Sequence, residues 1–393
     1  MADTGYITKT FEYRLRTNRK FVAACEVTLD SARFVYNCAL EHRISTYKQT
    51  GKGVDFYEQS RQLTAARREI PEVKATLRTI ESDALLRLDL AYDAFFKRGH
   101  GFPRFKGRDR YHTFSQTYEA VRPCPLKGDK LTVPGVGSCR VRLSRPMEGK
   151  VKQLRITRRT DGWYALLVCR IDRPEQLAKT GLTIGVDVGL IKFATLSNGE
   201  EIDNPRHTLQ AEENLAKEQR RLSRKKKGSH RRKKARNKVA LRHLKVSRSR
   251  KDFHHKEAKK IVDRFDRIGV EDLNVRGMIR HPTLAKAISD VGWSQFFSIT
   301  QSKAESAGRV FERRDPRYTS QTCSECGHRQ KMPLAIRTFV CEACQFVCDR
   351  DHNAALNLDR AGHARIKRSR SGTAHEEART DKTRQMTLFP ERL

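Results

Sequence analysis

The sequence has no apolar stretch long enough to cross a membrane as a helix. The run "WYALLVC" at residues 163–169 has only the length of a strand, whereas a helical span needs roughly 18–20 apolar residues. The first residues, "MADTGYITKTFEYRL", also lack the apolar core of a secretory signal peptide. We therefore expect a cytoplasmic protein with no membrane partner.

Acidic residues are scarce. The 393 residues include 46 Asp and Glu against 81 Lys and Arg, which gives a formal net charge of +35. An excess of this size attracts polyanions and releases their counterions, so nucleic acid is the expected partner and an anionic membrane is the weaker alternative. The length suits two or three domains with real hydrophobic cores.

The positive charge is concentrated between Lys217 and Lys251, where eighteen Lys and Arg residues accompany a single acid, Glu218. A charged run is often only the solvated face of a helix, but these cations would repel one another without a polyanion beside them. We therefore expect this helical segment to contact nucleic acid. The residues expected to make the contact are Arg231, Arg232, Lys233 and Lys234.

The cysteines do not form a disulfide pattern. Five of the ten are scattered singly through the first 169 residues, and the other five fall between residues 323 and 348. Cys323-x2-Cys326 and Cys341-x2-Cys344 are two knuckles with fourteen residues between them, a spacing typical of four thiolates around one Zn²⁺. Four thiolates leave no open position, so the site would be structural; free or redox thiols are the alternative. Cys348 is left without an assignment.

Hydrophobic periodicity divides the first half of the chain. Residues 6–15 alternate as a strand does, residues 20–97 space their apolar side chains by three and four as helices do, and residues 112–172 return to short strands around Pro, Gly and Asp-Gly turns. The pattern predicts a β-rich domain that begins at the N-terminus and is interrupted by a helical block.

The second half begins a new unit. Residues 181–202 predict a buried strand, a turn and a second strand that ends at the hairpin signal Asn198-Gly199. After the basic helical segment come a short buried strand, "RIGVEDLNV", and a helix at about 293–306. His254 and His255 are expected on the surface of a helix.

Three acids stand where strands end or a helix begins. Asp187 ends the apolar strand "TIGVD", Glu271 ends "RIGVE", and Asp351 opens a helical pattern just after the cysteines, close to Asp349. Any one of them could be a strand-end acid facing water or a helix cap. A carboxylate on a buried strand is costly to desolvate unless a cation compensates it. Together the three fit better as a shared site for two Mg²⁺, as in RNase H-like nucleases.

Several segments, in this order, resemble one family. They are "GVDVGLIKFATLSNGE", "GVEDLNV", "RRDPRYTSQTCSECG" and "CDRDHNAALNL", with "RFVYNCAL" and "GFPRFKGRDRYHTF" in the N-terminal half. The sequence is similar to TnpB (OrfB) proteins, which are transposon-encoded RNA-guided endonucleases related to type V CRISPR effectors. The resemblance covers most of residues 6–362. Gln345 departs from it, because the second knuckle often has Gly there.

The resemblance implies a function and its site. It implies cleavage of guide-matched DNA by two-metal-ion hydrolysis, with a guide RNA, two Mg²⁺ and one structural Zn²⁺, on double-stranded DNA that carries a short adjacent motif. Asp187, Glu271 and Asp351 match the family's catalytic acids, and Asp349 does not. The oligomeric state stays open.

The expected fold class is multidomain α+β: an N-terminal β-barrel with a helical insertion, then an RNase H-like (RuvC) α/β nuclease with an inserted zinc ribbon. The expected domains are a wedge-like β-barrel at 1–20 and 111–175, a helical recognition insertion at 21–110, a RuvC-like nuclease domain at 176–320 and 346–362, a zinc ribbon at 321–345 and a disordered basic tail at 363–393.

Some alternatives stay open. Phe102, Arg104, Phe105 and Lys106 interleave aromatic and basic side chains as base-stacking surfaces do, but they could equally form a corner packed on the core. The loop 318–320 either contacts phosphate or only leads into the first knuckle. A compact type V CRISPR effector would share the chemistry, and a regulator that binds without cutting would lack it.

Overall fold

The computed structural model describes residues 5–74, 76–118, 124–173, 175–333 and 336–360. It has the mixed α and β content that we predicted. Its contacts divide into two compact units, Met1–Gln176 with Thr208–Ser249, and Leu177–His207 with Arg250–Leu393. The expected tail at 363–393 lies outside the described residues. None of the described helices is both long and apolar enough to span a membrane.

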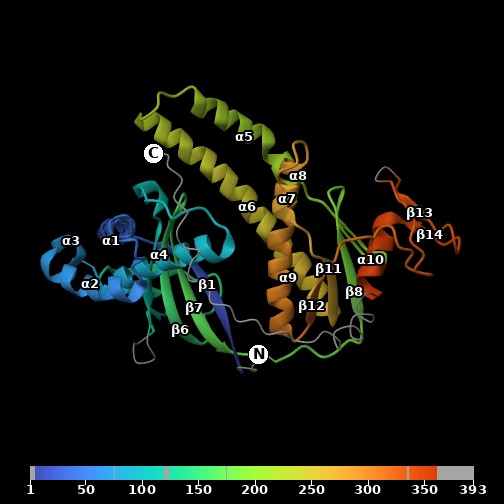
Figure 1. Cartoon of the computed structure of the whole chain (residues 1–393), viewed down its shortest axis with the longest axis horizontal. Helices are drawn as coiled ribbons and strands as arrows, with labels where there is room; N and C mark the ends of the chain where they lie inside the picture. Colours follow the sequence, from blue (N-terminus) through green and yellow to red (C-terminus); the bar gives the residue numbers. More distant parts are fainter. Residues whose placement is uncertain (1–4, 75, 119–123, 174, 334–335, 361–393) are drawn as a thin grey trace. The chain divides into compact units, whose positions relative to one another are not determined.

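The first unit contains a seven-stranded sheet with the order β2-β6-β7-β1-β5-β4-β3 (Figure 1). Its central strand β1 pairs antiparallel with β5 and β7. No ladder between the described strands joins β2 to β3, so closure into a barrel stays a prediction. The strands are β1 Tyr6–Arg16, β2 Thr113–Thr117, β3 Leu126–Lys127, β4 Lys130–Val133, β5 Gly137–Arg142, β6 Lys150–Arg159 and β7 Gly162–Asp172.

Four α-helices and a short 3-10 helix, Arg108–Arg110, lie between β1 and β2 in the described part of the chain. Asn18 caps the first of them by accepting the N–H of Phe21 (2.8 Å), and Gly51 ends it in the left-handed conformation. The alternation in β1 buries Phe11 and Tyr13, which join one core with the apolar faces of the helices. The helices are α1 Arg19–Thr50, α2 Phe56–Glu69, α3 Pro71–Lys74 and α4 Arg78–Arg98.

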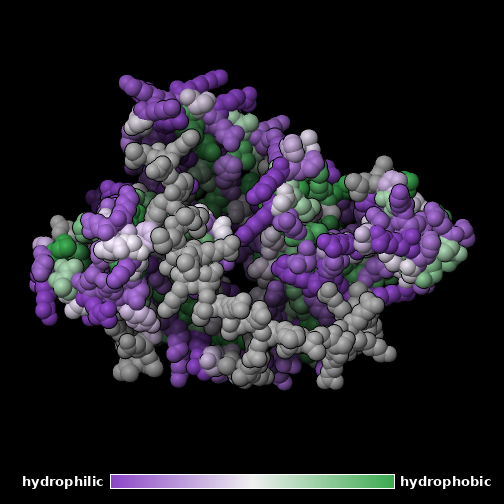
Figure 2. Space-filling model, viewed as in Figure 1, coloured by the Kyte–Doolittle hydropathy of each residue, from purple (hydrophilic) through white to green (hydrophobic). Residues whose placement is uncertain are grey.

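The basic segment forms two helices, α5 (His207–Ser223) and α6 (His230–Arg264). The turn between them includes Gly228, whose φ of 84° favours glycine. The exposed side chains over these helices are mostly hydrophilic (Figure 2). The prediction for His254 was wrong: its side chain is fully buried in α6, and its Nε2 lies 2.9 Å from the carbonyl oxygen of Val291.

The second unit contains a five-stranded sheet with the order β10-β9-β8-β11-β12. Strands β8, β11 and β12 are parallel, and β9 and β10 are antiparallel to their neighbours. The strands are β8 Thr183–Val188, β9 Lys192–Leu196, β10 Glu201–Asp203, β11 Arg267–Glu271 and β12 Val310–Arg314. Three helices lie between β11 and β12 in the chain: α7 Val275–Met278, α8 Ala285–Val291 and α9 Trp293–Ala307.

The chain then forms a small hairpin of β13 (Thr338–Val340) and β14 (Val347–Asp349) and continues directly into α10 (Arg350–Arg360). Figure 1 shows α10 beside β8. The approach is very close: a β-carbon on Gly185 would lie 1.9 Å from the carbonyl oxygen of Ala355, and one on Gly269 would lie 2.5 Å from that of Leu358. Glycine is therefore required two residues before each strand-end acid, in "IGVD" and in "IGVE".

Replacing Gly185 with alanine should displace α10, because the contact is with backbone and no side chain can swing away. We expect Gly185→Ala to destabilise the second unit by about 1–3 kcal/mol, the usual size of an overpacking defect, seen by calorimetry as a lower melting temperature. Gly53→Ala is the control, because its β-carbon would meet nothing within 4 Å. Equal melting temperatures for Gly185→Ala and wild type would contradict the close packing of α10.

Candidate functional site

The predicted acids stand at neighbouring positions in the second unit. Asp187 is the fifth residue of β8, Glu271 is the last residue of β11, and Asp351 is the second residue of α10. The parallel pairing of Val186 with Val270 puts the first two acids, each one residue further on, at the same edge of the sheet. The close crossing of α10 over both strands carries the third acid toward them.

The three carboxylates affect one another electrostatically. Burial raises the pKa of Asp187 well above its usual range, and the charges of Glu271 and Asp351 raise it further. Burial also raises the pKa of Glu271, with a further contribution from the charge of Asp351. Carboxyl groups that share one site resist being ionised at the same time, because their negative charges repel one another. Among the described residues, the group of side chains placed to hold a metal ion is the cysteine cluster, and the three acids are not part of it.

Asp349 and Asp351 have different roles at the start of α10. Asp349 Oδ1 accepts the backbone N–H of Asp351 (2.8 Å) and of His352 (3.1 Å), so it caps the helix. The side chain of Asp351 instead lies near Arg337 Nη1 (3.4 Å) and Arg350 Nε (3.6 Å). The helix cap and the presented carboxylate are thus two separate residues.

Thr319, in the loop before the first knuckle, contacts a carboxylate. Its hydroxyl donates to Glu271 Oε1 at 2.7 Å, and this hydrogen bond partly offsets the rise in the pKa of Glu271. We predicted either phosphate contact or a simple connecting loop for residues 318–320. No motif in the sequence signalled this contact.

The four predicted zinc ligands come together. The sulfur atoms of Cys323, Cys326, Cys341 and Cys344 lie within 4.8 Å of one another. Two of the sulfur–sulfur distances are 3.7 Å and 3.5 Å, and a tetrahedron with Zn–S bonds of about 2.3 Å has edges of about 3.8 Å. The donor set therefore fits one structural Zn²⁺. The remaining cysteine of this region, Cys348, is not in the cluster.

Both knuckles repeat one backbone arrangement. The N–H groups of Gly327 and Gln345 each donate to the carbonyl of the first cysteine of their knuckle at 3.0 Å. In the second knuckle the N–H of Cys344 donates to the sulfur of Cys341 (3.5 Å), which lowers the pKa of Cys341 to about 6. The thiolate form is thus favoured at Cys341, whereas desolvation and hydrogen bonds with the other cysteines raise the pKa of Cys344 to about 12.

Two asparagines on α10 bind the first knuckle to the helix. Asn353 Oδ1 accepts the N–H of Ser324 (2.9 Å), and its Nδ2 donates to the carbonyl of Thr322 (2.8 Å). Asn357 Nδ2 donates to the carbonyls of Thr319 (2.9 Å) and Thr322 (2.7 Å). Being four residues apart, the asparagines share one face of α10. The cysteine cluster and the helix that carries Asp351 are therefore one structural unit.

The four residues predicted to contact nucleic acid at positions 102 and 104–106 differ in their packing. Phe102 packs edge-on against Tyr92 and Phe95, and the backbone of Lys106 exchanges hydrogen bonds of 2.8 Å and 3.1 Å with Asn37. These contacts favour the packed-corner interpretation at those two positions. Phe105 is 49% exposed, and Arg104 is exposed as well.

Arg232 differs from its neighbours in the basic run. Its Nη1 donates to the carbonyls of Leu222 (3.2 Å) and Lys225 (2.8 Å), so it closes the C-terminal end of α5. Arg231, Lys233 and Lys234 are exposed. Three of the four predicted residues are thus available for contact with a phosphate backbone.

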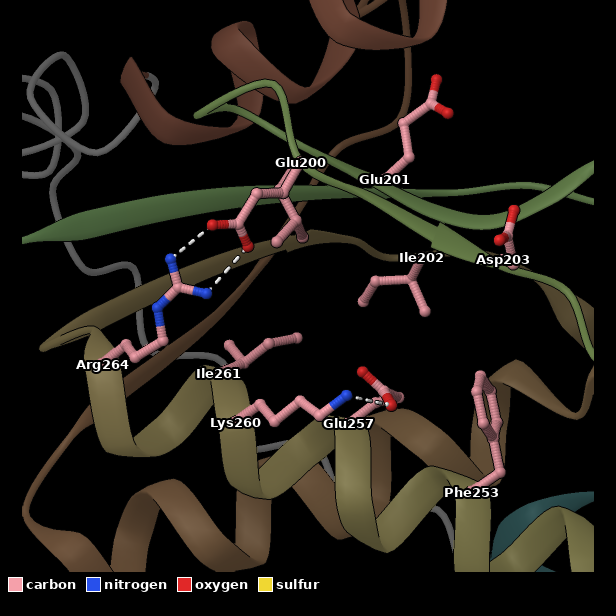
Figure 3. A pocket seen from close by; sticks show the side chains of 10 residues that line it. Glu200, Glu201, Ile202, Asp203, Phe253, Glu257, Lys260, Ile261 and Arg264 are labelled. Atoms are coloured by element: carbon pink, nitrogen blue, oxygen red, sulfur yellow. Dashed lines mark hydrogen bonds and ion pairs between the residues drawn. The ribbon is translucent and has the colours of Figure 1, made fainter.

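One surface cavity of about 450 Å³ lies between β10 and α6 (Figure 3). Its walls carry acids that are already paired: Arg264 contacts Glu200 at 2.6 Å, and Lys260 contacts Glu257 at 2.8 Å. None of the three predicted catalytic acids lines this cavity. It is therefore separate from the candidate site.

Three family models match the chain. Residues 166–281 match OrfB_IS605, described as "Probable transposase"; residues 293–358 match "Cas12f1-like, TNB domain"; and residues 1–52 match "Helix-turn-helix domain" of the same OrfB group. The described part of residues 1–52 contains β1 and the single 32-residue helix α1, with no second helix. The name of the third model thus does not describe the geometry of this segment.

Whole-chain relatives agree with these matches. A "Putative RNA-guided DNA endonuclease" of Streptomyces pristinaespiralis is 33% identical over 91% of this chain and 90% of its own length. InsQ of Escherichia coli K12, named in the same way, is 27% identical over 91% and 92%. A structure titled "Cryo-EM structure of the Cas12f1-sgRNA-target DNA complex" has a TM-score of 0.58 at 15% identity, covers 91% of this chain and 99% of that one, and shows a shared fold. The chain belongs to the TnpB (OrfB) family.

Zinc affinity should depend on whether glycine follows the second cysteine of each knuckle. Gln345 has a φ of 60°, where the equivalent Gly327 has 76°, and a side chain in this region costs about 1 kcal/mol. We expect Gln345→Gly to hold zinc against a chelator roughly fivefold more tightly, as that energy implies, and Gly327→Ala to hold it less tightly. Chelator competition measures both variants, and equal zinc retention in the two would contradict the knuckle geometry.

Proposed function

We propose that this protein is an RNA-guided DNA endonuclease of an insertion sequence, acting on guide-matched double-stranded DNA. Two observations support the proposal: Asp187 and Glu271 stand at corresponding positions of the parallel strands β8 and β11, and the charges of Glu271 and Asp351 both act on Asp187. Family membership over nine-tenths of the chain supports the same activity. Because the target is DNA, we infer that the protein works beside the prokaryotic chromosome, in the cytoplasm.

The donor set fits Mg²⁺. All three side chains offer carboxylate oxygens, which hard cations prefer. Burial and the neighbouring negative charges raise the pKa of Asp187, and a cation would relieve this accumulation of negative charge. When bound, divalent ions would supply activation of a water molecule and stabilisation of the leaving oxygen. We infer that Asp187, Glu271 and Asp351 hold these ions and that Asp349, which caps α10, does not.

The remaining residues of the site orient the carboxylates and bind the polymer. The hydroxyl of Thr319 fixes Glu271 Oε1, and Arg337, at 3.4 Å from Asp351, adds positive charge where a phosphate would bind. The exposed cations of α5 and α6 supply attraction to the nucleic-acid backbone. Sequence recognition would come from base pairing with the guide RNA and from a short motif beside the target.

The order β10-β9-β8-β11-β12, with its antiparallel hairpin and parallel second half, supports an RNase H-like (RuvC) nuclease core. The seven-stranded sheet with its helical insertion fits the wedge-like and recognition parts that this activity needs. A compact type V CRISPR effector is the alternative, with the same chemistry and a different source of guide. Sequencing of the RNA that copurifies with the protein separates the two.

Removing any one of the three acids should stop cleavage and leave binding intact. We expect Asp187→Ala, Glu271→Ala and Asp351→Ala each to abolish cutting of a guide-matched DNA in Mg²⁺. Affinity for RNA and target should persist, because it comes from the basic surface and from base pairing. Asp349→Ala is the control and should cut at a rate much closer to wild type. The assay uses the copurified RNA and a target with a randomised flank.

A basic-surface variant should behave in the opposite way. Neutralising Arg231, Lys233 and Lys234 together should weaken nucleic-acid binding and flatten its salt dependence by roughly 0.7–0.9 log units per lost contact.

A wild-type protein that binds a matched target and never cuts it, in Mg²⁺ or Mn²⁺, would favour the regulator without catalysis. If the Asp349→Ala protein does not cut and the Asp351→Ala protein cuts as fast as wild type, the assignment of the third acid is wrong.

A further inference from the structure

We propose that Thr319 is a positioning residue for Glu271, and that the cysteine cluster acts on the candidate site through the loop that carries Thr319. The inference rests on the proposed nuclease function. It concerns how one carboxylate is held in place, which neither the family matches nor the relatives' names address.

The contact itself is specific. The Thr319 hydroxyl has one proton, and two acceptors lie within reach: Glu271 Oε1 at 2.7 Å and the carbonyl of Pro316 at 3.2 Å. The shorter bond, to a charged acceptor, is the stronger one. It ties one carboxylate oxygen and thereby sets the rotation of the group at the end of β11. Partners of this kind, one step behind a ligand, orient metal-binding side chains.

The loop is held in a conformation that costs energy. Tyr318 has a φ of 67°, which is rare for an aromatic residue. The guanidinium of Arg329 stacks on the Tyr318 ring with its carbon 3.0 Å from the ring centre. The N–H groups of Gln321 and Thr322 both donate to the carbonyl of Tyr318, at 3.0 Å and 2.9 Å. Strain of this kind persists only where the surroundings over-determine the backbone.

The surroundings are the zinc ligands on one side and α10 on the other. Cys323 follows Thr322 directly, and Arg329 lies within the same knuckle region. Asn357 of α10 binds the carbonyls of both Thr319 and Thr322. The helix that presents Asp351 therefore also fixes the segment that orients Glu271, so two of the three acids share one support.

Direct measurement of ion binding tests this without relying on cleavage. The probe is MnCl₂ titrated into the purified protein with its copurified RNA, with free Mn²⁺ followed by electron paramagnetic resonance. The same titration of the Glu271→Ala protein measures the background of Mn²⁺ bound to the RNA. We expect Thr319→Val to bind Mn²⁺ about 10–100-fold more weakly than wild type, the usual loss when such a partner is removed. Thr319→Ser, which keeps the hydroxyl, should bind much more nearly as wild type does.

The matched control is Thr322→Val, the same change three positions along, at a threonine that binds the asparagines of α10 through its backbone carbonyl. It should match wild type, and zinc content should be equal in all variants. If Thr319→Val loses zinc, the comparison of Thr319→Ala with Thr319→Ser replaces it. Equal Mn²⁺ affinity with and without the hydroxyl, or no Mn²⁺ bound above background, overturns the inference. If the wild-type protein binds Mn²⁺ but never cuts a matched DNA, the proposed function is wrong. The Mn²⁺ affinities of the Thr319 variants still decide whether Thr319 positions Glu271.

Discussion

The carbonyl oxygens of Ala355 and Leu358 occupy the space where β-carbons of residues 185 and 269 would lie. This contact between the backbone of α10 and two parallel strands is the constraint on which the candidate site depends. It fixes how near the start of α10 can come to the ends of β8 and β11. Because backbone atoms on both sides make the contact, no change of rotamer can relax it, and interiors transmit such displacements.

The cysteine cluster works together with this packing. A hairpin as small as β13–β14 buries little apolar surface of its own, with Phe339 as its fully buried aromatic residue, and a bound metal contributes directly to folding in such modules. Asn353 and Asn357 then connect the first knuckle to α10 through backbone hydrogen bonds. The short distance along the chain from Cys344 to Asp351 thus has a physical meaning: one small module both folds around its thiolates and carries a carboxylate.

The sequence was informative where local rules decide the structure. The spacing of the cysteines predicted a cluster that the structure confirms, and the alternation of strands and helices predicted the mixed architecture. It was uninformative where distant contacts decide. The hydrogen bond from Thr319 to Glu271 joins residues 48 positions apart, and no local pattern encodes it. His254 follows the periodicity of a basic helix, yet it is buried against Val291. Arg232 belongs to a run of cations, yet it caps the preceding helix.

The central claim is that three carboxylates from two strands and one helix form a single site for divalent cations. Anomalous diffraction from crystals of the protein soaked in Mn²⁺ tests it most directly, with the zinc absorption edge identifying the cysteine site in the same crystal. The account predicts a manganese peak in contact with Asp187, Glu271 and Asp351 and a separate zinc peak among Cys323, Cys326, Cys341 and Cys344. A manganese peak bound elsewhere, with no density joining the three carboxylates, would contradict it.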